Sequence, residues 1–117
     1  QLEYVMNCSP KVLYTWLSTA SGLNEWFADT VKVKGKKFTF GWEGSEQSAE
    51  MVLHKENRLV RFQWEGEEDF FEFKITQDEL TGDVSLIVID FTEEEDLDET
   101  KGLWDLQIND LKRILGS

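Results

Sequence analysis

The spacing of apolar residues changes along this chain, and that change constrains the fold more than any other feature. In the segments between Val31 and Thr92, apolar side chains recur at every second position, whereas over residues 98–115 they recur at helical spacing. A period of two is typical of strands with one buried face, and a period near 3.6 is typical of a helix. Because 117 residues suffice for one domain, we expect a single α+β domain over residues 1–117.

Turn residues divide the alternating region into short strands. Glu56-Asn57, Glu65-Gly66 and Gly82-Asp83 are turn signals between apolar runs. The predicted strands are residues 2–7, 31–34, 38–42, 49–54, 59–64, 69–77 and 83–92. Consecutive strands with short links form a meander, so we expect a curved antiparallel sheet of about six to seven strands.

Three helices are predicted around these strands. Ser9 and Pro10 combine a capping hydroxyl with a proline suited to the first helical position, so a helix begins there and ends near residues 19–22. A second short helix covers residues 23–28. The last helix, residues 98–115, carries an apolar stripe and has acids in its first turn, as the helix dipole prefers.

Several segments, in order along the chain, resemble one known family. They are Ser9-Pro10 with residues 13–17, the segment GLNEWFAD at 22–29, FGWEG at 40–44, NRLVRFQW at 57–64 and residues 102–115. Their order and spacing are similar to those of the activator-of-Hsp-ninety-ATPase homologues, within the START-like superfamily. The resemblance implies a helix-grip fold, in which the sheet wraps the long C-terminal helix. It also implies a space between them that commonly holds an apolar small molecule.

Aromatic residues make up 13% of the chain. By strand alternation, most of them point to one side of the sheet, where tryptophans from the helices meet them. The candidate ligand-binding residues are Trp26, Phe40, Trp42, Met51, Phe62, Trp64, Phe71, Phe73, Trp104 and Ile108. These side chains would either line a pocket for an apolar ligand or fill the core outright, and the close packing of protein interiors favours the filled core.

The formal net charge of −12 argues against nucleic acid and membrane surfaces as partners, because binding there depends on Lys and Arg. It also favours neutral or cationic ligands, unless Arg61 or Lys74 turns inward to meet an anion. The acidic run at 93–99 lacks the spacing of a calcium loop and is interpreted as a solvated helix entry. The lysines at 32–37 are interpreted as protection of a strand edge.

The residues available for catalysis are few. Cys8 is the one cysteine and His54 the one histidine, and their spacing does not indicate a nucleophile and base pair, so a buried thiol and a surface imidazole are favoured. Asp90 follows an apolar strand. Turned inward near Trp104, it would be a polar anchor for a ligand or an acid with a raised pKa, but an outward orientation is favoured. No metal or cofactor is expected.

The leading hypothesis is a non-enzymatic module that binds a small apolar or amphipathic ligand. One alternative is a protein-interaction domain like the chaperone activators, and a less favoured one is a cyclase or hydrolase using Asp90 or His54. The longest uninterrupted apolar run is 86–89, far short of a membrane span, and no secretory signal is visible. We therefore expect a cytoplasmic monomer or homodimer without membrane insertion.

Overall fold

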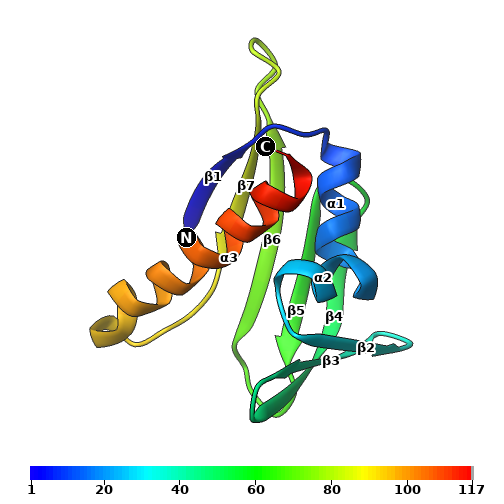
Figure 1. Cartoon of the computed structure of the whole chain (residues 1–117), viewed down its shortest axis with the longest axis vertical. Coiled ribbons are helices and arrows are strands. Elements are labelled where there is room, and N and C mark those ends of the chain that lie inside the picture. Colours follow the sequence, from blue (N-terminus) through cyan, green and yellow to red (C-terminus); the bar gives the residue numbers. More distant parts are fainter. Residues whose placement is uncertain (117) are drawn as a thin grey trace.

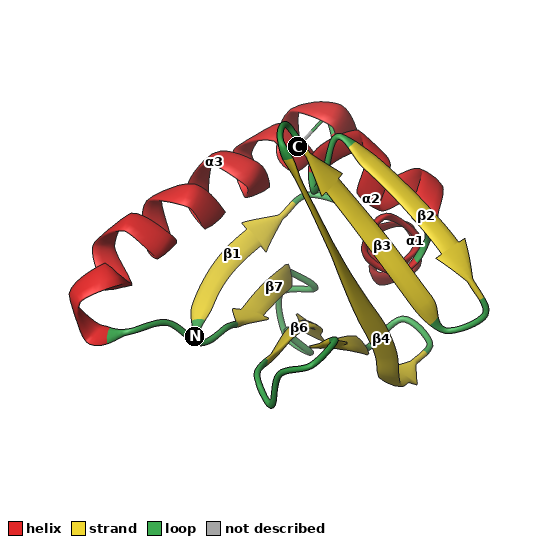
Figure 2. Ribbon diagram, turned by 90° about the horizontal axis from the view of Figure 1, so that it is seen from below, coloured by secondary structure: helices red, strands yellow, loops and turns green. Residues whose placement is uncertain are grey.

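The computed structural model describes residues 1–116, whose elements are shown in Figure 1. The strands are β1 (Leu2–Met6), β2 (Thr30–Lys34), β3 (Lys37–Trp42), β4 (Ser45–Lys55), β5 (Leu59–Trp64), β6 (Phe70–Gln77) and β7 (Val84–Ile89). The helices are α1 (Pro10–Ser18), α2 (Ala20–Trp26) and α3 (Leu97–Leu115), with a short 3₁₀ turn, η1 (Glu94–Asp96), before α3. The strands form one seven-stranded sheet in the order β1-β7-β6-β5-β4-β3-β2. The sheet curves around the three α-helices, which share its concave side (Figure 2).

Every neighbouring pair of strands is antiparallel, as the meander prediction requires. Two strand boundaries differ by more than one residue from those expected. Strand β4 begins at Ser45 rather than Ala49, because the turn at Glu43-Gly44 pairs Ser45 with Trp42 at once. Gly44 has a φ of +80°, a conformation that glycine adopts without strain. Strand β7 ends at Ile89, before the predicted residue 92.

The inner face of the sheet is aromatic. Phe62 and Phe71 are opposite each other on β5 and β6, and their ring centroids are 5.0 Å apart. Phe27, at the end of α2, stacks on Phe71 with centroids 5.3 Å apart. Burying a phenylalanine side chain contributes about 1.5–3 kcal/mol, so this cluster supplies a large share of the core stability.

The two short helices meet at a shared capping residue. The hydroxyl of Ser9 accepts the N–H of Val12 and begins α1, as predicted. Helix α2, however, begins at Ala20 rather than at residue 23. The reason is that the hydroxyl of Thr19, just after α1, accepts the N–H of Gly22 and caps the second helix.

Gly22 allows α1 and α2 to approach closely. A Cβ at this position would lie 2.7 Å from the Cα of Trp16 and 2.9 Å from the carbonyl oxygen of Thr15. Both neighbours are backbone atoms, which cannot swing away as a side chain end can. The close contact therefore requires a residue without a side chain.

We expect Gly22→Ala to lower the free energy of unfolding by about 1–3 kcal/mol, because the added methyl overpacks this contact. Gly102→Ala is the matched control, since a Cβ at Gly102 meets open space within α3. There the helix propensity of alanine should raise stability by about 0.5–1 kcal/mol. Urea denaturation of both variants measures the difference, and equal effects would show that the α1–α2 contact is not tight.

Helix α3 packs on the sheet through one face and projects beyond it at its start. Trp104, Ile108 and Leu111 are buried. Gln107 donates from Nε2 to the carbonyl oxygen of Phe27 at 2.9 Å, which ties α3 to the end of α2. The first turns extend past β1 and β7 in Figures 1 and 2, so Leu97 stays half exposed although it lies on the same helix face as Trp104.

None of the helices within residues 1–116 is both long and apolar enough to cross a membrane.

Candidate functional site

A cavity of about 190 Å³ lies between β1, the end of β7 and the first half of α3. We call it the β1–α3 cavity. Its walls are Gln1, Leu2, Val88, Asp90, Thr92, Leu97, Asp98, Thr100, Lys101 and Trp104. Leu2 and Val88 are opposite each other in the β1–β7 pair and form part of the apolar wall on the sheet side. The cavity exists because α3 leaves the sheet at an angle here, while its second half packs tightly.

Asp90 is held at one wall of this cavity. Its Oδ2 accepts the indole N–H of Trp104 at 2.9 Å, and its Oδ1 accepts the backbone N–H of Phe91 at 2.8 Å. The favoured outward orientation of Asp90 is therefore wrong. Alternation from the inward Val84, Leu86 and Val88 continues past the end of β7 and turns Asp90 toward α3.

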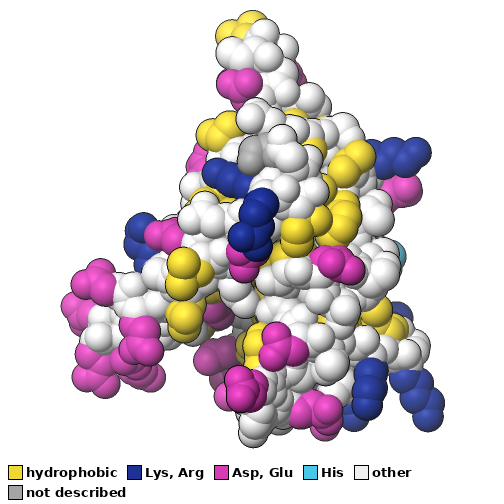
Figure 3. All heavy atoms as spheres, in the orientation of Figure 1, with side chains coloured by type: hydrophobic (Ala, Val, Ile, Leu, Met, Phe, Trp, Pro, Cys, Tyr) yellow, Lys and Arg dark blue, Asp and Glu magenta, His cyan; other side chains and the backbone are white. Residues whose placement is uncertain are grey.

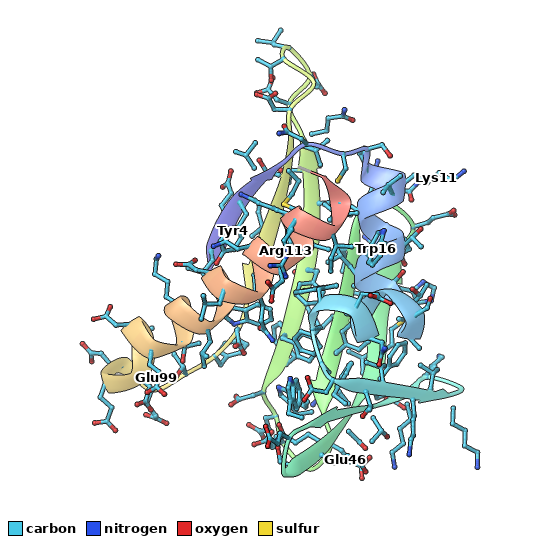
Figure 4. The ribbon with its side chains drawn as sticks, in the orientation of Figure 1. Tyr4, Lys11, Trp16, Glu46, Glu99 and Arg113 are labelled. Carbon is cyan, nitrogen blue, oxygen red and sulfur yellow. The ribbon has the colours of Figure 1, made fainter. Side chains whose placement is uncertain are left out.

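A second polar group ties β1 to α3 beside the cavity. The hydroxyl of Tyr4, labelled in Figure 4, donates to Oδ1 of Asp105 at 2.8 Å. Nζ of Lys101 lies 3.0 Å from Oδ2 of the same carboxylate. The hydrogen bond from Lys101 lowers the pKa of Asp105, and the hydrogen bond from Tyr4 lowers it further. Burial raises the pKa of Tyr4, and so does the neighbouring Asp105 carboxylate. Lys101 thus forms its ion pair with Asp105.

Six of the predicted site residues pack in or against the core and do not line this cavity. Phe40, Phe62, Phe71, Phe73 and Ile108 are each at most 1% exposed, and Met51 is half-buried against them. Their rings contact one another, as in the 5.5 Å separation of Phe71 and Phe73 and the 6.0 Å separation of Phe40 and Phe62. The central space between sheet and helix is occupied by these side chains.

The four predicted tryptophans lie in three different places. Trp104 lines the β1–α3 cavity. Trp26 and Trp42 border an open cleft beside α2, where their indoles donate to the carbonyl oxygens of Trp16 and Phe27. Trp64 borders another open cleft with polar neighbours at the β5–β6 turn. The structure therefore does not bring the predicted set together around one space.

Most walls of the β1–α3 cavity were missed from the sequence. Leu2 and Val88 are ordinary inner-face strand residues, and alternation alone could have placed them facing α3. No sequence pattern indicated Thr100 or Leu97 as wall residues, because they line the cavity only as a result of the angle at which α3 leaves the sheet. Thr100 also donates to the hydroxyl of Thr92 at 3.0 Å, linking the helix to the segment after β7.

The residues considered for catalysis are not arranged for it. His54 is exposed on β4, and Cys8 is half-buried at the start of α1. Burial raises the pKa of the Cys8 thiol, which lowers its thiolate fraction and its nucleophilicity. Both oxygens of Asp90 already accept hydrogen bonds.

Charge is distributed unevenly over the surface. Acidic side chains gather over the first turns of α3, whereas lysines gather over the β2–β3 hairpin (Figure 3). The acidic run at 93–99 forms η1 and the first turn of α3, and its side chains are exposed. Arg61 and Lys74 share the convex face of the sheet: Arg61 pairs with Glu72 at 2.8 Å, and Lys74 is exposed. Neither cation turns inward toward the helices.

The family follows from a match to the whole sequence. A family model described as the START-like superfamily domain matches residues 1–117. The chain belongs to the START-like superfamily. The predicted helix-grip architecture, with a seven-stranded antiparallel sheet and a long C-terminal helix, is thereby confirmed.

Solved structures of START-like fold resemble the chain closely. BfR322 from Bacteroides fragilis is 38% identical, with a TM-score of 0.68 over 97% of this chain and 88% of that one. The Aha1 dimer from Colwellia psychrerythraea is 18% identical, with a TM-score of 0.76 over 95% of this chain and 90% of that one. DynU16, a protein in the dynemicin biosynthetic locus, is 14% identical, with a TM-score of 0.83 over 99% of this chain and 46% of that one.

At 18% and 14% identity, the last two similarities show the fold alone. Among curated proteins, none matches this chain.

Proposed function

We propose that this protein binds a small apolar or amphipathic molecule in the β1–α3 cavity, without catalysing a reaction on it. The observation that carries the proposal is the cavity itself, about 190 Å³ between the sheet and the long helix. Its walls combine four apolar side chains with six polar or charged residues, so an amphipathic ligand would find both kinds of contact there.

The size of the cavity sets the size of the ligand. An apolar cavity of about 150 Å³ in another protein accommodates benzene. A single ring with a short substituent therefore suits this cavity, whereas a sterol or a long acyl chain would exceed its volume. Leu2, Val88 and Trp104 would contact the ring, since they form the apolar walls.

The filled core favours the β1–α3 cavity, rather than the space between the middle of the sheet and the helices, as the ligand site. Phe62 and Phe71 stack directly, and Phe27 covers Phe71 from α2. A ligand in the central space would have to displace these rings, at a cost of several kcal/mol for each side chain removed from the core. The cavity at the end of the helix needs no such displacement.

The test is a titration with benzyl alcohol, followed by ¹H–¹⁵N spectra of the tryptophan indoles. We expect the Trp104 indole resonance to shift saturably, because Trp104 lines the cavity, while those of Trp26 and Trp42 stay in place as internal controls. Leu2→Phe should weaken binding by about tenfold or more by filling the cavity, a loss of about 1.4 kcal/mol.

Leu80→Phe is the matched control, since Leu80 is 97% exposed on the β6–β7 turn. It should leave the affinity unchanged. Shifts at Trp26 or Trp42 instead of Trp104 would place the ligand elsewhere. No binding by a well-folded sample would contradict the proposal and favour the protein-interaction alternative, for which the exposed Leu103 and Leu106 on α3 would be the first candidates.

A further inference from the structure

We propose that the ligand of the β1–α3 cavity is a small organic amine, whose ammonium group is held by Asp90 and Asp98 while its apolar body contacts Trp104. This inference rests on the proposed binding function and specifies the class of ligand. It follows from the charges that surround the cavity and from their existing partners.

The wall carries two carboxylates and one cation. Asp90 and Asp98 line the cavity together with Lys101. Lys101 does not neutralise either of them, because its Nζ lies 3.0 Å from Asp105, which is outside the wall. Asp105 is further held by the hydroxyl of Tyr4 at 2.8 Å. The charge that faces a ligand is therefore negative.

Asp90 is already oriented for a second donor. Each of its oxygens accepts one hydrogen bond, from the Trp104 indole and from the N–H of Phe91. A carboxylate oxygen has two acceptor positions, so each retains capacity for an ammonium donor. Asp90 is half-buried, and a charge-assisted hydrogen bond between an ammonium group and a carboxylate is stronger at such a position than in bulk water.

Trp104 provides the complementary apolar and π contact. Its ring is 6% exposed, and it is fixed by the bond to Asp90 and by stacking on Phe27 with centroids 5.9 Å apart. Indole is the aromatic side chain that attracts cations most strongly. An amine with a ring attached would therefore satisfy the carboxylates and the apolar wall together.

The charges around the cavity are also mainly negative. Asp98 belongs to the acidic run at 93–99, and Figure 3 shows acids gathered over this part of α3. The two cations considered as anion partners, Arg61 and Lys74, belong to the convex face of the sheet. An anionic ligand would meet repulsion at long range, and the one cationic side chain in the wall, Lys101, is already paired with Asp105.

The test compares three probes of one size: benzylamine, which is protonated at neutral pH, benzyl alcohol and benzoate. All samples carry the same blocked amino terminus, because Gln1 lines the cavity and a free amino group there would add a positive charge. We expect benzylamine to bind about two to five times more tightly than benzyl alcohol at low salt, the range of a partly exposed ion pair. High salt should reduce that ratio, and benzoate should bind most weakly.

Asp98→Asn and Asp90→Asn should each reduce the preference for benzylamine severalfold and leave the affinity for benzyl alcohol nearly unchanged. Asp98→Asn changes an exposed helix residue and keeps the protein testable if Asp90→Asn unfolds it. Glu46→Gln removes one charge from β4, which is separated from β1 by three strands of the sheet; Glu46 lies well away from Glu99 at the start of α3 (Figure 4), so this variant should leave the preference intact.

Equal affinities for benzylamine and benzyl alcohol, or a preference that survives both aspartate variants, would overturn the amine inference and leave the binding function standing. Tighter binding of benzoate would do the same. Absence of binding by all three probes would overturn both, so the two failures are distinguishable.

Discussion

Replacement of Trp104 by alanine is expected to lower the free energy of unfolding by about 3–5 kcal/mol, the usual cost of removing a large buried aromatic side chain. Trp104 is the buried residue of α3 nearest its projecting part, and it stacks on Phe27 and meets Phe73 edge-on at 5.8 Å. The change also removes the indole donor to Asp90 at 2.9 Å. Guanidinium denaturation followed by far-ultraviolet circular dichroism measures the loss.

Leu103→Ala is the control for this experiment, because Leu103 is the adjacent helix residue and is exposed. Its effect should stay within about 0.5 kcal/mol. Trp104→Phe keeps a six-membered aromatic ring and removes the indole N–H together with part of the ring volume, so its loss should lie between about 1 kcal/mol, the worth of the hydrogen bond, and the full cost of Trp104→Ala. A denaturation midpoint for Trp104→Ala equal to that of the parent would show that α3 is not packed on the sheet as described.

Removal of α3, by ending the chain at Asp96, is expected to abolish cooperative unfolding. The deletion uncovers Phe27 and Phe73, which Trp104 contacts, and with them the concave side of the sheet. A large exposed apolar face favours association or a molten state. We expect strong binding of an apolar dye, loss of the near-ultraviolet signal and a broad thermal transition.

A chain ending at Arg113 is the matched control, because it keeps Trp104, Ile108 and Leu111, the buried residues of α3. It should unfold cooperatively, with reduced stability from the loss of the Gly116 cap, whose N–H donates to the carbonyl oxygens of the last turn. A soluble, cooperatively unfolding chain ending at Asp96 would count against the helix-grip architecture.

The strands and helix caps were accessible from the sequence because they depend on local chemistry. Residues 59–64 were predicted as a strand with the observed bounds, since the alternation there is regular and turn residues precede and follow it. Ser9 and Pro10 set the start of α1 through one hydrogen bond within a single turn. The start of α2 was wrong by one helical turn because Thr19, within the segment taken as the end of the first helix, is also a capping residue.

The candidate site was less accessible. The sequence identified Trp104 and considered an inward Asp90, but the other predicted residues, such as Phe62 and Phe71, pack in the core or border other clefts. The ion pair between the partly exposed Arg61 and the buried Glu72, on the convex face, was not predicted. A pairing between strands depends on register, and register cannot be read from one strand.

By itself, the sequence determined the order of elements, the inner face of the aromatic strands, the acidic character of the chain and its likeness to the START-like family. These follow from spacing, caps, turns and composition, which act over a few residues. Only the tertiary structure decided that the central aromatic side chains fill the core and that a cavity lies between Leu2, Val88 and the start of α3. The physical reason is that a cavity is the volume left between elements distant in sequence, and it depends on the angle at which α3 leaves the sheet.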